Sequence, residues 1–423
     1  MRVLCGLACL LVACGSDPAS TSAVTDEDPP PSVDPVPSPP SDPPDPPTAP
    51  DPDPSEAPAI APEALEGAPE EGCEVGAPTR VFTGDAWVDV AATEDAFVVA
   101  GVSRLGDGEH AFAASVTPGA APRLIARRAL EADAMSGHRR AGPALAIAGS
   151  RAALLYPDGE RHLVLTVFDP SGEGPLQPRS IAEGASLQFA PALAWRDQAL
   201  LAAWTDQEAG GRRVFATRVT NGRAAAPVDL SPSAGGAASP TFVADTDGLR
   251  LIYVDAREAT SVIHRVDASG DAYGAPEVLR AVSLLTDPPH AASVRMRGAD
   301  WLVYTGIGAV ATTAVGLVAL TGSQPPTAVV SGTGYGVLYV GAASFGDGAV
   351  IVADVPTAAP AESPREVQLR TVDGSGGLQE PVTLRGPRGT AARVRVAVRG
   401  VDIAVAFADT DGAYVAFARC AVP

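Results

Sequence analysis

The stretch APALAWRDQALLAAWTDQEAGGRRVFATRVTNGRAAAPVDL, residues 190–230, decides the fold of this chain. It contains four short runs rich in apolar residues, which are 191–195, 199–206, 213–219 and 226–230. Apolar and polar side chains alternate within the runs, and Gly, Asp and Asn lie between them, which is typical of β-strands joined by tight turns. The stretch therefore predicts four antiparallel strands within roughly 40 residues.

The same unit recurs along the chain. Residues 249–255 (LRLIYVD) match residues 200–206 (LLAAWTD), and 261–266 and 275–279 match the third and fourth runs. The positions that correspond to Trp204 are Ala100, Tyr156, Tyr253, Tyr304, Val352 and Phe407. Neighbouring positions in this series are 48 to 56 residues apart, so seven copies fill residues 73–423.

Four-strand units that repeat at this length are typical of β-propeller blades. We therefore expect an all-β fold, a seven-bladed β-propeller of four-stranded antiparallel blades in residues 73–423. Two steps of 55 and 56 residues leave six or eight blades open as alternatives. The aromatic residues at the Trp204 position are expected to pack between neighbouring blades. Residues 124–134 lack the strand pattern, and we expect a loop or one helical turn there.

The two ends of the repeat array complement each other. The last copy, residues 393–420, has only three runs, while the first copy has a surplus run at 77–82 before Trp87. This surplus run begins Ala-Pro, as does the fourth-strand run at 275–279. We therefore expect the N-terminal strand to complete the C-terminal blade, which closes the ring without a free inner edge.

The N-terminus has the features of an export signal. Met1-Arg2 precedes an apolar segment at residues 3–12, which is too short to span a bilayer. It ends in Leu-Val-Ala-Cys at residues 11–14, which resembles the lipobox of bacterial lipoprotein signals. The resemblance implies that residues 1–13 are removed and that Cys14 is lipidated, so that acyl chains anchor the protein to a membrane. An ordinary secretory signal with an incidental Cys14 is the alternative.

A proline-rich segment follows Cys14. Residues 15–72 contain 18 Pro and 14 Asp or Glu but no Lys or Arg. Such a composition favours extended polyproline II structure without a packed core, so we expect residues 14–72 to be a disordered tether. At ~3.1 Å per residue it could hold a domain up to ~180 Å from the lipid. Lipoproteins retained in the inner membrane tend to carry Asp directly after the lipidated Cys. This chain has Gly15 there, which favours the outer membrane, and either the periplasmic or the external face is compatible with the sequence.

The cysteines fit this arrangement. Cys5 and Cys9 belong to the signal and Cys14 to the anchor, which leaves Cys73 and Cys420. Two cysteines in an exported protein usually pair. Cys420 ends a third strand and Cys73 precedes the surplus fourth strand, so a Cys73–Cys420 disulfide would replace the hairpin that joins these strands in other copies. Two free thiols are the alternative.

Charge excludes one class of partner. The formal net charge is −20, with 50 Asp and Glu against 30 basic residues, all of them Arg. Nucleic-acid binding needs clustered cations for the phosphates, so we expect no nucleic-acid partner. No apolar run reaches about 18 residues, so no spanning helix is expected.

Catalytic and metal motifs are weak in this sequence. It has no His-Glu-x-x-His, Gly-x-Ser-x-Gly or Cys-x-x-Cys, and we expect its five histidines, at 110, 138, 162, 264 and 290, to be surface or loop residues. Residues 306–311 (GIGAVA) mimic a dinucleotide loop, but β-branched residues follow instead of a helix, so we expect a turn. Asp-Thr-Asp-Gly at 245–248 and at 409–412 could offer carboxylates to Ca²⁺, although each also fits a tight turn, the interpretation we favour. No cofactor is expected, with Ca²⁺ as the open alternative.

Five aspartates occupy one position of the repeat, at the end of the second strand, and they are Asp158, Asp206, Asp255, Asp354 and Asp409. A ring of carboxylates at one rim could bind a cation or a polar ligand. The simpler interpretation, which we favour, is that each Asp ends its strand by bonding the turn backbone.

As a whole, the chain resembles exported bacterial lipoproteins that carry a β-propeller behind a Pro-rich tether. We expect a monomeric, lipid-anchored cell-envelope protein that displays a non-catalytic binding module for a protein or glycan partner. One alternative is a sialidase-like or other glycoside-cleaving propeller, whose Asp-box turn, Ser-x-Asp-x-Gly-x-Thr-Trp, is absent here. Another is a purely structural envelope protein, since fold does not decide among these classes.

Overall fold

The computed structural model describes residues 69–423 except for short segments. These segments are 107, 131–141, 160–161, 173, 184–188, 209–210, 232–234, 246–247, 258–259, 283–289, 308–312, 332–338, 358–363, 389–392 and 410. The predicted signal peptide, Cys14 and the tether up to residue 68 lie outside the described residues.

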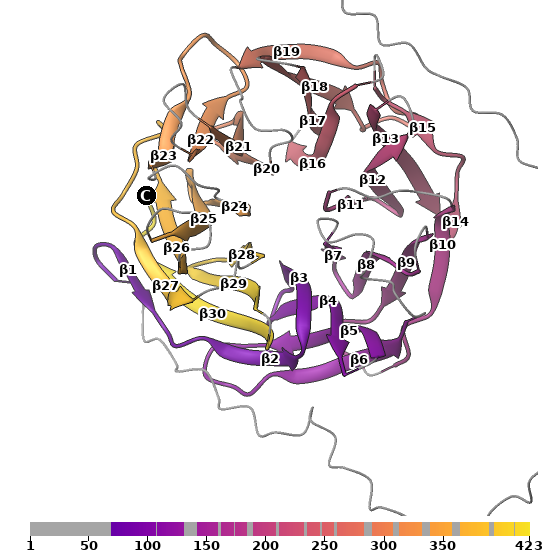
Figure 1. Ribbon diagram of the computed structural model, residues 1–423, viewed down its shortest axis with the longest axis horizontal. Helices are drawn as coiled ribbons and strands as arrows, with labels where there is room; N and C mark the ends of the chain where they lie inside the picture. Colours follow the sequence, from indigo (N-terminus) through magenta and orange to yellow (C-terminus); the bar gives the residue numbers. More distant parts are fainter. Residues whose placement is uncertain are drawn as a thin grey trace, which may run out of the picture. The chain divides into compact units, whose positions relative to one another are not determined.

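The described residues form seven antiparallel sheets arranged around a central axis (Figure 1). Blade one contains β3 (Asp85–Ala92), β4 (Phe97–Leu105), β5 (Gly108–Val116) and β6 (Arg123–Ala129). Blade two contains β7 (Ala144–Ala148), β8 (Arg151–Pro157), β9 (His162–Phe168) and β10 (Pro178–Glu183). Blade three contains β11 (Ala192–Arg196), β12 (Ala199–Glu208), β13 (Gly211–Thr220), β14 (Arg223–Ala224) and β15 (Val228–Asp229).

The remaining blades follow the same plan. Blade four contains β16 (Ala237–Asp245), β17 (Gly248–Arg257), β18 (Thr260–Asp267) and β19 (Glu277–Val282). Blade five contains β20 (Ala291–Met296), β21 (Ala299–Ile307), β22 (Thr313–Ala319) and β23 (Thr327–Ser331). Blade six contains β24 (Val340–Phe345), β25 (Gly348–Pro356), β26 (Arg365–Val372) and β27 (Val382–Arg388). Blade seven contains β28 (Arg395–Arg399), β29 (Asp402–Asp409) and β30 (Gly412–Cys420), and the N-terminal strands β1 (Cys73–Val75) and β2 (Thr79–Thr83) join it.

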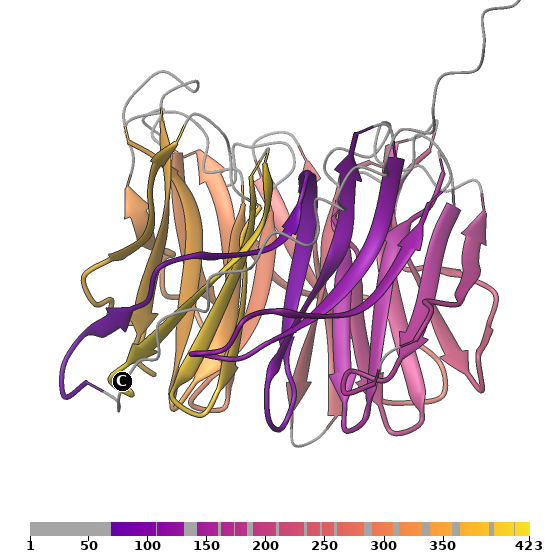
Figure 2. The same cartoon turned by 90° about the horizontal axis from the view of Figure 1, so that it is seen from below.

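The ring closes as the sequence predicts. Strands β1 and β2 both pair antiparallel with β30, so the first described strands become the outer edge of the last blade. Figures 1 and 2 show these indigo strands alongside the yellow β30. Cys73 lies directly opposite Cys420 in the register, and the two form a disulfide with 4.0 Å between their Cα atoms. The predicted seven blades and the predicted disulfide are thus confirmed.

The core lies between neighbouring sheets. Trp204 is 2% exposed and packs in one cluster with Ala144 and Leu155 of blade two. Tyr156 packs with Val98 of blade one in the same manner. Because each blade buries both faces against its neighbours, the aromatic residues at this repeat position fill the gap between sheets, as predicted.

One segment differs from the prediction. Residues 124–134 were expected to form a loop or a helical turn, but Arg123–Ala129 is strand β6, which pairs with β5. The register shifts between Ala113 and Ala114, and Ile125 occupies the extra position on β6. A β-bulge of this kind breaks the two-residue alternation, so the pattern did not indicate a strand. Residues 131–134 lie outside the described part of the chain.

Antiparallel order gives the ring two distinct faces (Figure 2). We call the hairpin face the one where first strands turn into second strands and third strands into fourth, for example at Asn221-Gly222. We call the loop face the one where second strands end and first strands begin. Asn221 and Gly222 have φ angles of 50° and 72°, so this two-residue turn needs residues that tolerate a left-handed backbone. The described residues contain no apolar helix long enough to cross a membrane.

Candidate functional site

A cavity opens on the axis near the loop face, where the first strands begin. It has a volume of about 210 Å³ and touches the first strand of every blade. Most of its lining is small or apolar, as at Ala192, Ala291 and Gly341. Polar atoms make up most of its exposed surface, much of it between these small side chains. Since ligand sites are usually concave and carry a few polar side chains, this axial cavity is the candidate site.

Asp89 and Arg395 are the oppositely charged residues of this lining. Asp89 lies on β3 of blade one, and its Oδ1 is 3.9 Å from Nε of Arg395 on β28 of blade seven. The backbone N–H of Leu145 in blade two donates to Asp89 Oδ2 at 2.7 Å, and the N–H of Val90 donates to Oδ1 at 2.9 Å. One carboxylate therefore connects three blades at the point where the ring closes.

The pKa of Asp89 is raised above its ordinary value, because burial removes water from the carboxylate. Arg395 and the N–H groups of Leu145 and Val90 lower the pKa, but desolvation is the larger effect. Only 17% of the Asp89 side chain is exposed. A carboxyl group with a raised pKa in a cavity is a functional candidate, although structural clasps also perturb pKa values.

Aromatic rings from three different blades contact one another beside the cavity, and two of them, Phe189 and His290, line it. The ring of His290, which precedes β20, lies 5.7 Å from that of Phe189 and 4.8 Å from that of Tyr339. The His290 backbone N–H donates to Thr305 Oγ1 at 2.9 Å, and the Thr305 N–H donates to the His290 carbonyl at 2.9 Å. These bonds hold the histidine against β21, so its ring has a defined place at the cavity.

Sequence reasoning missed both Asp89 and His290 as site residues. Asp89 interrupts the apolar run from Ala86 to Ala92 of β3, and this is the signal that could have indicated it. The prediction that all histidines lie in loops or on the surface was wrong for His264, which is 3% exposed on β18 and stacks on Tyr253 at 4.9 Å. His264 lies opposite Tyr253 in the register of β17 and β18, so both side chains point to the same face of the blade. The sequence pattern alone did not show that this face is buried. His138 lies outside the described residues.

The five predicted aspartates end the second strands, as the repeat requires, but most are buried rather than presented at a rim. Exposed fractions are 5% for Asp158, 1% for Asp255, 0% for Asp354 and 4% for Asp409, while Asp206 is half-buried. No three His, Cys, Asp or Glu side chains converge as a metal site in the described part of the chain. Binding of a cation or a polar ligand by this ring stays the untested alternative to the strand-ending role that we favoured.

Arginine side chains contact three of these aspartates, Asp158, Asp354 and Asp409. Arg128 of β6 donates to Asp158 Oδ2 at 2.9 Å, and Arg385 of β27 donates to Asp409 Oδ2 at 2.8 Å. Both arginines lie at the same position of the fourth strand, and each reaches the next blade. An Arg at the same fourth-strand position in two blades was the sequence signal that could have predicted these Arg–Asp pairs. Asp158 and Asp409 therefore form ion pairs across blade interfaces, which meets the need of a buried charge for a hydrogen-bonded partner.

The pair within blade six extends this network. Arg365 Nε donates to Asp354 Oδ2 at 2.8 Å, and both side chains are buried. Arg385 also donates to the Arg365 carbonyl at 3.1 Å. Two buried ion pairs are thus joined across the interface of blades six and seven.

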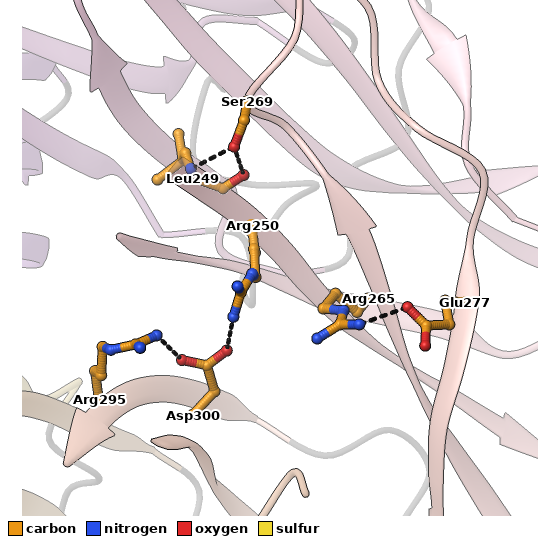
Figure 3. Close-up of polar contacts among 7 residues, drawn as sticks. All are labelled: Leu249, Arg250, Arg265, Ser269, Glu277, Arg295 and Asp300. Carbon is orange, nitrogen blue, oxygen red and sulfur yellow. Dashed lines mark hydrogen bonds and ion pairs between the residues drawn. The ribbon is translucent and has the colours of Figure 1, made fainter. Parts of the chain in front are cut away.

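A related cluster joins blades four and five on the hairpin face (Figure 3). Asp300, 6% exposed, accepts from Arg250 at 2.8 Å through Oδ2 and from Arg295 at 2.8 Å through Oδ1. Figure 3 shows both guanidinium groups reaching the one carboxylate from different strands. Both oxygens of Asp300 therefore have cationic donors, so we assign the cluster a structural role, in which it links blades four and five.

The remaining sequence motifs lie in connections. Asp245 pairs with Gly248 across the turn from β16 to β17, and Asp409 pairs with Gly412 across the turn from β29 to β30. The end residues of both Asp-Thr-Asp-Gly motifs thus pair across a strand connection, as a tight turn requires, while residues 246, 247 and 410 lie outside the described part. The Gly-rich motif at 306–311 begins at the end of β21, and residues 308–312 lie outside the described part.

Comparison with known proteins shows similarity at the level of fold only. No family model matches the chain, and no curated protein is significantly similar to it. Among solved structures, a thermostable family-43 glycoside hydrolase is 14% identical with a TM-score of 0.35, covering 59% of this chain and 93% of the hydrolase. AofleA from Arthrobotrys oligospora is 10% identical with a TM-score of 0.43, covering 68% of this chain and 84% of AofleA.

A third similar structure is a Trypanosoma rangeli sialidase, 8% identical with a TM-score of 0.43. The match covers 66% of this chain and 53% of the sialidase. At these identities and TM-scores the likeness carries no functional argument.

Proposed function

We propose that this chain is a lipid-anchored cell-envelope protein whose propeller is a non-catalytic binding module for a protein or glycan partner. The axial cavity is the proposed contact site. The observation that carries the proposal is the engagement of Asp89, which accepts two backbone N–H groups and lies beside Arg395. This carboxylate is occupied in holding blades together.

Glycoside cleavage, the alternative function, needs more than the one carboxyl group that Asp89 supplies. It requires two carboxyl groups about 5–10 Å apart, one protonated and one ionised. Asp89 is the sole acidic side chain among the described residues of the cavity lining. A single engaged carboxylate among the described lining residues supports binding over hydrolysis.

The test of binding against catalysis uses one protein preparation. The chain is applied to an array of glycans and envelope components, and it is also incubated with a panel of aryl glycosides that includes a sialoside. We expect retention on the array without hydrolysis. Turnover that disappears in Asp89→Asn while the variant stays folded would establish the enzyme instead. If the chain shows no retention on the array and no turnover, the result would favour a purely structural envelope protein.

The anchor is tested separately. Cys14 follows an apolar segment and a lipobox-like sequence, so we expect labelled palmitate to be incorporated into the wild-type chain and lost in Cys14→Ser. Cell fractionation would then place the wild-type protein with the outer membrane. Release of Cys14→Ser into the soluble fraction is the matching result, and unchanged membrane association would contradict lipidation.

A further inference from the structure

A second hollow lies on the hairpin face between blades two and three, away from the axial cavity. Its volume is about 290 Å³, close to the lower limit of ~300 Å³ for small-molecule sites. The floor consists of Leu165, Leu200 and Val219, which are all buried. The hollow therefore has an apolar base and a volume near that of small-molecule sites.

The walls of this hollow carry hydrogen-bonding groups but no acid. Besides Trp195, its polar lining consists of Arg151, Gln177, Arg179, Gln198 and Asn221. The three amide side chains are exposed and can both donate and accept, as sugar hydroxyls require. The neighbouring Asp197 is outside the lining and lies 3.7 Å from Arg196.

The two arginines of the hollow differ from those that clasp the blades. Arg128, Arg365 and Arg385 each contact a buried Asp. Neither Arg151 nor Arg179 forms an ion pair with any residue that the structure describes, although the chain carries a net charge of −20. Their two positive charges are available to an anion.

Local contacts hold the cationic wall in place. Arg179 Nη1 donates to the Gly222 carbonyl at 2.6 Å, and the Arg151 guanidinium lies 4.5 Å from the centroid of the Trp195 ring. The Trp195 indole N–H donates to the Ala146 carbonyl of blade two at 3.2 Å. Because these side chains are oriented before any ligand arrives, less conformational entropy is lost on binding.

We infer that this hollow binds an acidic sugar unit, a ring that carries a carboxylate or a sulfate. Guanidinium groups match the geometry of both anions, the amides suit the hydroxyls, and the apolar floor takes the C–H face of the ring. This site is independent of the membrane anchor and of the axial cavity, so it stands even where the cavity binds nothing.

The experiment titrates the full chain with glucuronic acid and with galactose 6-sulfate, followed by isothermal calorimetry and tryptophan fluorescence. Glucose, acetate and sulfate are the controls. We expect saturable binding of at least one acidic sugar, with glucose and the simple anions much weaker. Preference for the carboxylate or the sulfate identifies which anion the arginines select.

The variant Arg179→Gln should weaken binding about ten-fold or more, because a charge-assisted hydrogen bond is lost. Arg80→Gln is the matched control, because this substitution removes the same charge outside the hollow. Arg80 is exposed on β2, which belongs to blade seven, whereas the hollow lies between blades two and three. We expect its affinity to equal that of the wild type. The inference is overturned by absence of acidic-sugar binding, by equal binding of glucose or the simple anions, or by equal affinities of the two variants.

Discussion

The disulfide that closes the ring allows a quantitative test. Cys73 and Cys420 are separated by 347 residues, and their strands also meet through backbone pairing and the packing of Val75. The chain-entropy relation gives roughly 5–6 kcal/mol for cross-linking a loop of this length, which is an upper value. Removal of native disulfides typically costs about 2–5 kcal/mol, so we expect Cys73→Ala/Cys420→Ala to lose about 3–6 kcal/mol of unfolding free energy.

The assay is urea denaturation followed by the fluorescence of the four tryptophans. Reductant should lower the midpoint of the wild type to that of the double variant and leave the variant unchanged. Thiol titration of denatured Cys5→Ser/Cys9→Ser/Cys14→Ser, in which only Cys73 and Cys420 remain, should find their thiols only after reduction. A change of less than about 1 kcal/mol, or two reactive thiols before reduction, would refute the reasoning that the covalent closure stabilises this ring.

Further variants test the contacts between blades. Arg385→Met removes the guanidinium group that is paired with buried Asp409 and should cost about 3–5 kcal/mol. Arg385→Met/Asp409→Leu should recover most of the loss, and equal urea midpoints for the two variants would contradict this. Trp204→Ala should cost about 3–5 kcal/mol in the same assay, and a loss below about 1 kcal/mol would show that Trp204 is not a packing residue. The raised pKa of Asp89 means that the folded state holds the proton more tightly than the unfolded state. The wild type should therefore lose stability relative to Asp89→Asn as pH rises from about 4 through the raised pKa, and a pH-independent difference would contradict the shift.

Much of the fold could be predicted because it depends on local pattern and on repetition. The runs around Trp204 show where strands lie, and the spacing of its counterparts shows how many blades there are. The surplus run at 77–82, together with Cys73 and Cys420, indicates that the first strand completes the last blade and closes the ring. The segment at Arg123–Ala129 was missed because a bulge disturbs the alternation on which strand recognition depends.

The sites were much less predictable. The aspartates that end the second strands are visible in the sequence, but their burial and their arginine partners are not. Arg128 and Asp158 are 30 residues apart and belong to different blades, so only the packing of sheets brings them together. The same holds for the hollow of Arg151 and Arg179, which is built from two blades.

By itself, the sequence determined the strand pattern, the sevenfold repeat, and the pairing of the first strand with the last. These depend on side-chain periodicity and spacing, which are properties of the chain read in order. Only the tertiary structure decided which charges are neutralised and which remain available. That outcome depends on desolvation and on distances between atoms of neighbouring blades, and no linear pattern records either quantity.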